Sequence, residues 1–278
     1  MVQNIWKDGV FGLIVGDALG VPVEFSSREE CEHNPMIGMR AYGTHNQPAG
    51  TWSDDSSMTL ATLDSIKQKG KIDYKDLMDK FTEWCLYADY TPFQEVFDIG
   101  VATSRAIIQH GKGTDPIDCG GKTEWDNGNG SLMRILPVCL YLYNRQKMIC
   151  TSENESIYLI HNVSALTHAH LRSQIACGIY YFMVKSVLSK EGDLLAKLPW
   201  GIDAACQYYR SDLNNYNELG YFSRLFDLNA FRQFSKDQIK SSGYVVDTLE
   251  AVTWCLITTT SYKEAVLQAV NLGDDTDT

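Results

Sequence analysis

Two acidic segments at distant points of the chain carry residue types that bind metal ions. The last five residues, 274–278, read Asp-Asp-Thr-Asp-Thr, and residues 53–56 read Ser-Asp-Asp-Ser. Carboxylates that are packed together repel one another, so a fold that brings these segments together needs cations between them. Carboxylate and hydroxyl oxygens at this density suit Mg²⁺ or Mn²⁺ rather than zinc. The sequence therefore indicates a site for hard divalent cations.

The upstream acidic segment also has an explanation that needs no ligand. Ser53 followed by two acids is a common way to begin a helix, because the hydroxyl accepts a bond from a free amide and the acids favour the positive end. A cap accounts for one acid, or for two, and leaves the metal interpretation open.

A glycine-rich segment, Asp126-Asn-Gly-Asn-Gly-Ser-Leu-Met-Arg134, has the composition of a ligand-binding loop. Gly128 and Gly130 allow the backbone to approach a ligand closely, and we expect a helix to start near Ser131. Free amides at a helix N-terminus bind phosphate groups. A tight Asn-Gly turn without a ligand is the alternative.

Two further candidates are single side chains. A helix from about Ile5 is expected to end near Gly20, which leaves Glu24 in the exit turn, as a site carboxylate or as a solvated loop residue. His168, in Thr-His-Ala-His at a predicted helix start, either contacts a ligand or is a buried structural histidine. A metal shared with His170 is not expected, because spacing i, i+2 places the two rings on different helix faces.

Helical periodicity dominates the elements that must position these residues. Apolar residues in 74–88 recur at i, i+3, i+4 and i+7, and similar patterns cover 157–164, 175–182 and 245–256. We therefore predict an all-α fold of about eight to eleven helices in one domain, residues 1–278. Long Gly- and Pro-containing loops are expected at 34–51 and 111–130, and residues 207–240 are left unassigned.

Composition narrows the class of protein. The 278 residues carry a formal net charge of −11, which argues against general nucleic-acid binding. Eight cysteines without CxxC spacing, Cys150 among them, are read as reduced thiols. The N-terminus shows no signal-peptide pattern and no apolar run approaches the roughly 20 residues of a membrane span. We expect a monomeric cytoplasmic protein.

The motifs occur in an order that resembles the ADP-ribosylglycohydrolase family, which includes the dinitrogenase-reductase-activating glycohydrolases. Each motif alone is weak, whereas six in order over essentially the whole chain are specific. The matching segments are Gly16–Gly20 with Glu24, Trp52–Ser56, Phe97–Gly100, Asn127–Arg134, Thr167-His168 and Gly273–Thr278.

The resemblance implies an all-α orthogonal helical bundle, a centre of two Mg²⁺ or Mn²⁺ ions, and hydrolysis of the glycosidic bond joining ADP-ribose to a protein side chain or a small conjugate. Carried over residue by residue, it implies three groups. The metal ligands are Ser53, Asp54, Asp55, Asp275, Asp277 and Thr278. The catalytic residues are Glu24, Asp126 and Asp275. The substrate-binding residues are Asn127, Gly128, Asn129, Gly130, Ser131, Met133 and His168.

Two departures from the family pattern bear on these expectations. The family often has Thr where this chain has Ser53, which keeps the hydroxyl. Family members usually continue past the terminal acidic motif into a Gly/Ala-rich core helix, so we expect that helix to be missing here, with metal affinity and stability below those of a longer relative.

Other functions remain open at this stage. A non-catalytic ADP-ribose binder, or a structural relative of crystallin type, would fit the same fold. A different metal-dependent phosphohydrolase on a helical scaffold is a third interpretation. The acceptor is not decided by the sequence, because acceptor contacts come from variable loops.

Overall fold

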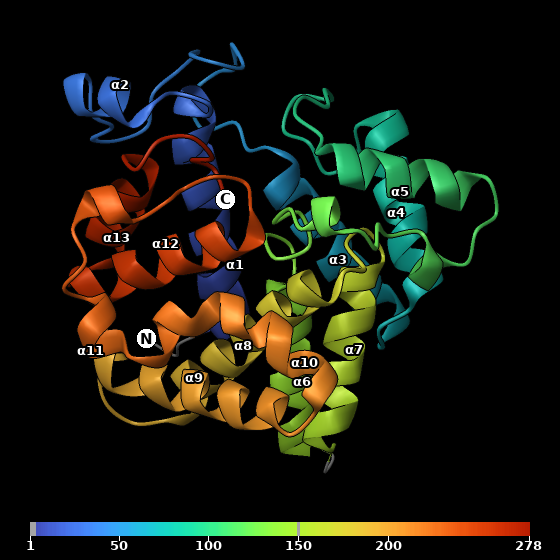
Figure 1. The fold of residues 1–278 in the computed structure, drawn as a ribbon. Coiled ribbons are helices and arrows are strands. Elements are labelled where there is room, and N and C mark those ends of the chain that lie inside the picture. The colour runs from blue at the N-terminus through green and yellow to red at the C-terminus, as the bar shows by residue number, and fades with distance from the viewer. Residues whose placement is uncertain (1–3, 149–150) are drawn as a thin grey trace. The chain divides into compact units, whose positions relative to one another are not determined.

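The computed structural model describes residues 4–148 and 151–278, and these residues form helices without any β-strand (Figure 1). The predicted all-α class is confirmed. Thirteen α-helices are present in this part of the chain, more than the eight to eleven expected, because the short helices α2, α10 and α11 have no apolar periodicity of their own. The α-helices are α1 (Ile5–Gly20), α2 (Arg28–His33), α3 (Asp54–Lys69), α4 (Tyr74–Tyr87), α5 (Val101–Gly111), α6 (Leu136–Met148), α7 (Glu153–Ala165), α8 (Leu171–Ser189), α9 (Leu194–Arg210), α10 (Leu213–Leu219), α11 (Leu228–Phe231), α12 (Val245–Thr258) and α13 (Tyr262–Val270).

Five short 3₁₀ helices connect these elements. They are η1 (Val21–Val23), η2 (Pro116–Asp118), η3 (Glu124–Asp126), η4 (Gly220–Phe226) and η5 (Lys236–Gln238). The chain separates into two compact units. Unit 1 comprises the chain up to Ile14 and Trp52–Tyr181, and unit 2 comprises Val15–Thr51 and Phe182–Thr278. The assignment of 1–278 to a single domain stays a prediction.

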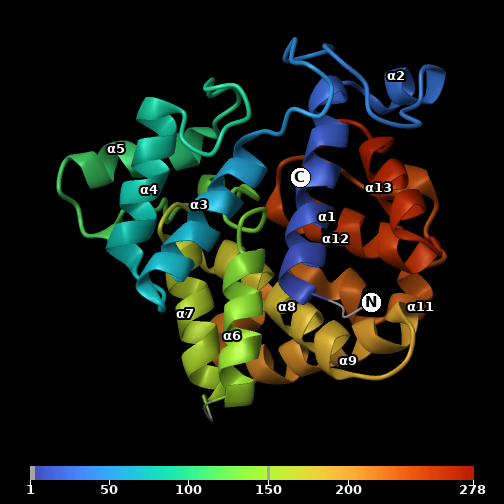
Figure 2. The same ribbon diagram turned by 180° about the vertical axis from the view of Figure 1, so that it is seen from behind.

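In unit 1, α3 and α4 lie side by side (Figures 1 and 2). Helix α4 begins where the Asp73 side chain accepts from the Asp76 amide, and it ends at Ala88, which adopts a left-handed conformation. Its apolar stripe is the one that the periodicity predicted, and Phe81 and Trp84 are at most 1% exposed. Burying such a side chain stabilises the fold by about 1.5–3 kcal/mol.

In unit 2, α12 and α13 lie side by side near the C-terminus (red and orange in Figure 1). A small apolar cluster joins the end of α1 to α13 and contains Leu19, Val23, Met36 and Val270. Around α9, the rings of Phe182 and Tyr208 pack with centroids 5.8 Å apart. Helix α1 ends at Gly20, as predicted.

One predicted boundary is wrong. The helix expected near Ser131 begins instead at Leu136, and residues 131–134 form a turn. The amides of Leu132 and Met133 both donate to the carbonyl of Asn129, at 2.7 and 3.1 Å. Pro137 then occupies the first turn of α6, where a missing amide proton costs nothing. Likewise, His168 lies in the connection between α7 and α8 rather than on a helix.

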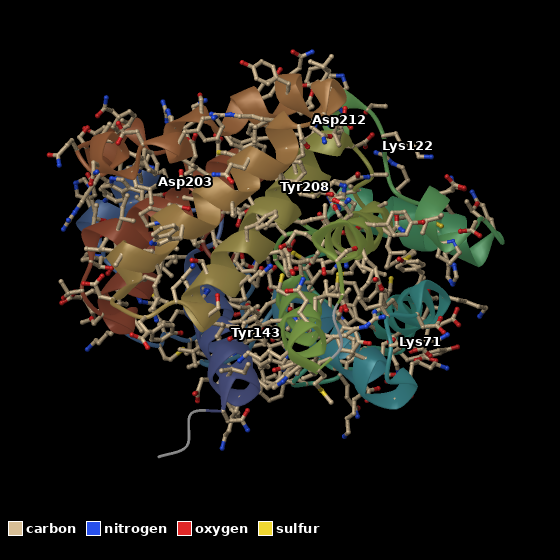
Figure 3. All side chains as sticks on the ribbon, turned by 90° about the horizontal axis from the view of Figure 1, so that it is seen from below. Lys71, Lys122, Tyr143, Asp203, Tyr208 and Asp212 are labelled. Carbon is tan, nitrogen blue, oxygen red and sulfur yellow. The ribbon has the colours of Figure 1, made fainter. Side chains whose placement is uncertain are left out.

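Charged side chains lie on the surface, and the described cysteines are free thiols, as the sequence analysis expected. Exposed lysines such as Lys71 and Lys122 project from unit 1 (Figure 3). Seven cysteines are free thiols, of which all but Cys85 are buried, and Cys150 lies outside the described residues. Among the helices that the structure describes, none combines the length and apolar character that crossing a membrane requires.

Candidate functional site

The upstream acidic segment opens helix α3 in unit 1. Ser53 is the N-cap, and its hydroxyl accepts from the Asp55 amide at 3.3 Å, so the capping interpretation is confirmed. Asp54 and Asp55 form the first turn of α3, and each is only 5% exposed. The positive end of the helix offsets part of the cost of burying two neighbouring carboxylates. Their positions are fixed by helix geometry.

The second acidic segment lies in unit 2 and has no regular structure. The Thr276 hydroxyl donates to the carbonyl of Gly20 at 2.9 Å, at the end of α1. Two backbone bonds connect Asp274 to residues 25–26, which follow η1. The Asp274 carbonyl accepts from the Phe25 amide at 2.7 Å, and the Asp274 amide donates to the Ser26 carbonyl at 2.8 Å. Asp277 is 6% exposed. Glu24 and the terminal acids, separate in the sequence, therefore belong to one packed region of unit 2.

Gly20 makes the approach of this segment possible. A Cβ at position 20 would lie 2.1 Å from the carbonyl oxygen of Thr276 and 2.5 Å from the Cα of Asp277. No heavy atom tolerates such a contact, so only glycine fits against the backbone of the acidic segment. The glycine of the Gly-Asp-Ala-Leu-Gly motif thus has a steric role as well as a helix-ending one.

Arg28 fixes the backbone just before this segment. Its guanidinium donates to three carbonyls, those of Leu272 at 2.9 Å, Lys236 at 2.8 Å and Ile239 at 2.6 Å. The Asp275 amide donates to the nearby Ser241 carbonyl at 3.0 Å. Arg28 was not among the sequence candidates, because nothing in a local pattern marks a side chain that bonds to distant backbone.

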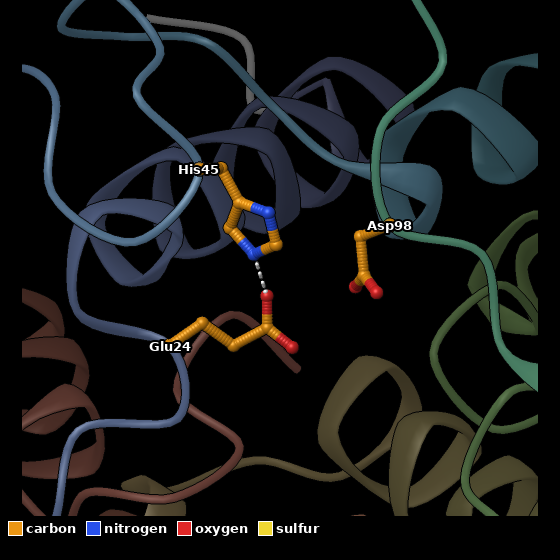
Figure 4. A group of neighbouring side chains, drawn as sticks. All are labelled: Glu24, His45 and Asp98. Atoms are coloured by element: carbon orange, nitrogen blue, oxygen red, sulfur yellow. Dashed lines mark hydrogen bonds and ion pairs between the residues drawn. The ribbon is translucent and has the colours of Figure 1, made fainter.

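Glu24 is buried beside a histidine that the sequence analysis also missed. Glu24 is 4% exposed and bonds through Oε2 to Nε2 of His45, within unit 2 (Figure 4). The Thr44 hydroxyl donates to the Glu24 carbonyl at 2.6 Å. The next residue, Phe25, has a left-handed backbone with φ of 63°, which is strained for a bulky side chain. The Glu24 carboxylate is therefore oriented by its 34–51 loop rather than solvated.

The glycine-rich segment presents unused backbone donors in unit 1. Among the described residues, the amides of Gly130 and Ser131 have no hydrogen-bond acceptor. A Cβ at Gly130 would lie 2.8 Å from Cε1 of His168 and 3.2 Å from Oγ1 of Thr103. Thr103, on α5, is 1% exposed, and its hydroxyl has no partner in the described part of the chain. Two amides, an imidazole and a hydroxyl thus converge at Gly130.

Asp126 lies close by in the same unit, with its charge already compensated. Its Oδ2 accepts from the Thr123 amide at 2.9 Å and the Thr123 hydroxyl at 2.6 Å, and its Oδ1 accepts from Arg105 at 3.0 Å. These hydrogen bonds from Thr123, together with the Arg105 charge, lower the pKa of the Asp126 carboxyl. Asp126 is therefore an ionised hydrogen-bond acceptor at neutral pH.

Two of the predicted substrate-binding side chains make hydrogen bonds inside unit 1, and a third is buried. The Asn127 amide donates to the Glu124 carbonyl at 3.0 Å, and its oxygen accepts from Ser173 at 3.1 Å. Ser131 is fully buried, and its Oγ lies 2.9 Å from Oγ of Ser164, whose single proton goes to the His168 carbonyl, so Ser131 donates in this pair. Met133 is 9% exposed. These side chains shape the loop, and the backbone amides of Gly130 and Ser131 are better placed to meet a ligand.

The predicted residues therefore form two groups. Unit 1 carries Ser53, Asp54, Asp55, Asp126, Asn127, Gly128, Asn129, Gly130, Ser131, Met133 and His168, and unit 2 carries Glu24, Asp275, Asp277 and Thr278. The proposed metal ligands are all carboxylate or hydroxyl oxygens, and most are buried, which is the chemistry that Mg²⁺ and Mn²⁺ prefer. The residues present fit such ions. That the two acidic segments share them stays a prediction.

A groove of about 770 Å³ in unit 1 is a different feature. It lies between α4 and the segment from α5 to η2, and Asp79, Leu86, Tyr87 and His110 are among its lining residues. His110 bonds to Asp79 at 2.8 Å. None of the predicted site residues lines this groove, so it is not where the motifs meet.

Comparison with known proteins agrees with the motif pattern. A family model described as ADP-ribosylglycohydrolase matches residues 4–278. The chain is 30% identical over 277 residues to ADP-ribosylarginine hydrolase Tri1 of Pseudomonas putida (strain GB-1), which covers 98% of this chain and 66% of that protein. It is 28% identical to the ADP-ribosyl-dinitrogen reductase glycohydrolase of Rhodospirillum rubrum, over 96% of this chain and 79% of that protein.

A solved structure, an ADP-ribosylglycohydrolase-related protein complex, superposes with a TM-score of 0.74 and 26% identity, covering 96% of this chain and 80% of the other. The chain thus spans about two thirds of the length of the Pseudomonas relative, at 66%.

Proposed function

The chain belongs to the ADP-ribosylglycohydrolase family, and on that premise we propose that it hydrolyses the glycosidic bond between ADP-ribose and an acceptor side chain. The resemblance drawn from the motifs is confirmed at the level of the family. The observation that supports the proposal is that the backbone amides of Gly130 and Ser131, the Thr103 hydroxyl and the His168 ring lie together, close to an ionised Asp126.

We assign the metal ligands to Ser53, Asp54 and Asp55 of unit 1 and to Asp275, Asp277 and Thr278 of unit 2. Two divalent cations, when bound, polarise ribose hydroxyls and lower the pKa of a bound water. The protein's own part is to hold the carboxylates in fixed positions. Helix α3 does this for the first group, and the contacts with Gly20 and Arg28 do it for the second.

The other residues have separate tasks. We propose that Glu24, oriented by His45, aligns the attacking water, since a carboxylate is the group that best holds a water while the anomeric carbon becomes positively charged. Asp126, held ionised, accepts from a ribose hydroxyl. The amides of Gly130 and Ser131 donate to an anionic or hydroxyl oxygen of ADP-ribose.

For the acceptor we propose arginine. The names of two similar proteins, from Pseudomonas putida and Serratia proteamaculans, specify ADP-ribosylarginine. The proposal therefore places the bond to be cleaved between ribose C1 and a guanidinium nitrogen.

The test is release of free ADP-ribose from ADP-ribosyl-arginine and ADP-ribosyl-serine peptides, with Mg²⁺, with Mn²⁺ and with EDTA. We expect cleavage of the arginine conjugate that EDTA abolishes. Equal activity in EDTA would refute the metal assignment. Tight ADP-ribose binding without cleavage of either peptide would instead support a non-catalytic binder.

A further inference from the structure

A line of buried polar contacts in unit 1 leads from Arg134 to His168. Arg134 is 0% exposed, and its guanidinium carbon lies 4.7 Å from the ring centre of Phe81. Its Nη2 donates to the Val163 carbonyl at 3.2 Å and to Oγ1 of Thr167 at 2.8 Å. Among the described residues, its Nε and Nη1 have no acceptor. Burial lowers the pKa of Arg134 to about 10, so the group remains a cation at neutral pH.

The Thr167 hydroxyl connects Arg134 to His168. A guanidinium only donates, so the Thr167 oxygen must accept from Arg134. The same oxygen lies 2.9 Å from Nδ1 of His168. Thr167 is 0% exposed, and within residues 4–148 and 151–278 its hydroxyl proton has no other acceptor.

Two proton arrangements are possible for this pair, and their costs differ. If Nδ1 carried the proton, it would donate to Thr167, and the hydroxyl proton would be left buried without an acceptor. If Nδ1 is bare, the Thr167 hydroxyl donates to it, and neither Thr167 Oγ1 nor His168 is left with a fully buried donor that lacks an acceptor. A buried unsatisfied donor is unfavourable, so the second arrangement is the stable one.

We propose that Arg134 and Thr167 fix His168 as the tautomer that carries its proton on Nε2, and that this N–H donates to a ligand oxygen at Gly130. Nε2 lies 3.4 Å from the position of a Cβ at residue 130, and no described residue bonds to it. The backbone of His168 is also fixed, since its amide donates to Ser164 at 2.8 Å and its carbonyl accepts from the Ser164 hydroxyl at 2.9 Å.

The histidine stays neutral over the physiological range. Burial, with a smaller contribution from the Arg134 charge, lowers the pKa of His168 to about 3. A neutral N–H donor beside Gly130 can donate to a hydroxyl oxygen or to a phosphate oxygen. It disfavours a ligand that places a donor group at this position. Arg134 and Thr167 are positioning residues for that selectivity. That the ligand is ADP-ribose rests on the proposed function, whereas the tautomer does not.

The tautomer is tested in the free protein by long-range ¹H–¹⁵N NMR of ¹⁵N-histidine-labelled samples at pH 7. The His168 signal is identified as the one lost in His168→Gln. We expect its Nδ1 to resonate as a bare nitrogen and its Nε2 as a protonated one. The reverse pattern in the wild-type protein would overturn the proposal.

A matched pair of variants tests the cause. Thr167→Val removes the hydroxyl at constant shape and should move His168 to the Nδ1–H tautomer or to a mixture, whereas Thr167→Ser should keep the wild-type pattern. Thermal unfolding verifies that both variants are folded. An unchanged tautomer in folded Thr167→Val would contradict the role of Thr167. If that variant does not fold, the Ser variant and the wild-type spectrum still decide the tautomer.

Binding separates this inference from the proposed function. Calorimetry with ADP-ribose should show about tenfold weaker affinity in Thr167→Val, because one hydrogen bond to the ligand is no longer oriented. Thr167→Ser should keep near wild-type affinity. Equal affinity in all three proteins would exclude His168 as the donor. No ADP-ribose binding by wild-type protein with an Nε2–H histidine would sink the proposed function and leave the tautomer assignment intact.

Discussion

The two acidic segments are held in place by different means. Asp54 and Asp55 are set by the first turn of α3, where one cap and the helix geometry determine both positions. Residues 274–278 have no helix, and their positions depend on contacts with Gly20, residues 25–26 and Ser241, and on the bond from Arg28 to the preceding Leu272. The first segment is a local structure, and the second is a tertiary one. Residues far from the second segment in sequence should therefore control it, whereas the first should resist such changes.

The largest effect is expected from removing one charge in each segment. Asp55→Asn and Asp277→Asn keep side-chain shape but remove a proposed metal ligand, and each should lower ADP-ribose release roughly 1000-fold. Activity assays and Mn²⁺ titration calorimetry measure this. Glu83→Gln and Glu29→Gln, at exposed acids of units 1 and 2, serve as controls and should leave both quantities unchanged. Full activity in one Asp variant would mean that a single segment forms the site.

Next in size is Gly20→Ala, which attacks the second segment without touching an acid. The new Cβ would lie 2.1 Å from the Thr276 carbonyl, so the segment must move. We expect the free energy of unfolding to fall by about 3 kcal/mol, with loss of Mn²⁺ affinity.

Gly16→Ala is the matched control on the same helix, since nothing lies within 4 Å of its Cβ. It should be neutral or stabilising by about 0.5–1 kcal/mol. Equal stability of the two alanine variants in urea titrations would show that residues 274–278 do not pack against α1.

Arg28→Lys should have a smaller effect on the same segment. A lysine cannot reproduce a planar guanidinium that serves three carbonyls, so we expect about 2 kcal/mol lower stability and weaker Mn²⁺ binding. Arg40→Lys is the control, because its bonds to Asn34 and Pro35 are exposed and local. Wild-type metal affinity in Arg28→Lys would make the contact purely structural.

The smallest predicted effect concerns Asp126, whose charge is compensated by its neighbours. Its pKa in the folded state is lowered by Thr123 and Arg105, so its contribution to stability is present above about pH 4, the range of an unfolded aspartate, and is lost as pH falls through the folded value. Asp126→Asn should thus be less stable than wild type at pH 7, with the difference shrinking in acid. Asp118→Asn, at an exposed pair with Lys122, is the control and should leave the free energy of unfolding at pH 7 nearly unchanged. The free energy of unfolding of wild type and both variants, measured by urea denaturation at several pH values, tests this prediction.

The parts of the fold that follow from local sequence were predicted well. The apolar spacing of α4 and the end of α1 at Gly20 are found as expected, because both depend on residues within a few turns. The start of α6 was placed five residues early, since the turn at 131–134 is stabilised by the Asn129 carbonyl and has helix-like composition. Residues 207–240 form short elements whose boundaries are set by packing rather than periodicity.

The same distinction applies to the site. The acids and the glycine-rich segment were identifiable from their composition. His45, Arg28 and Thr103 were not, because each is defined by what it meets in space, and for Arg134, although it ends the glycine-rich segment, the contact with Thr167 was not predicted. Thr276 and Gly20, for example, are bonded although they lie 256 positions apart. Only the tertiary structure pairs such residues, and a single sequence carries no signal for it.

The left-handed backbone at Phe25 has a consequence for how this region can change. A bulky residue held at φ of 63° stores about 1–2 kcal/mol, which the bond from its amide to Asp274 helps to retain. A glycine at position 25 would remove this backbone strain and raise the melting temperature. It would also make the backbone more flexible and leave the Glu24 carboxylate less precisely oriented. Thermal stability and a precise orientation of Glu24 therefore favour different residues at position 25.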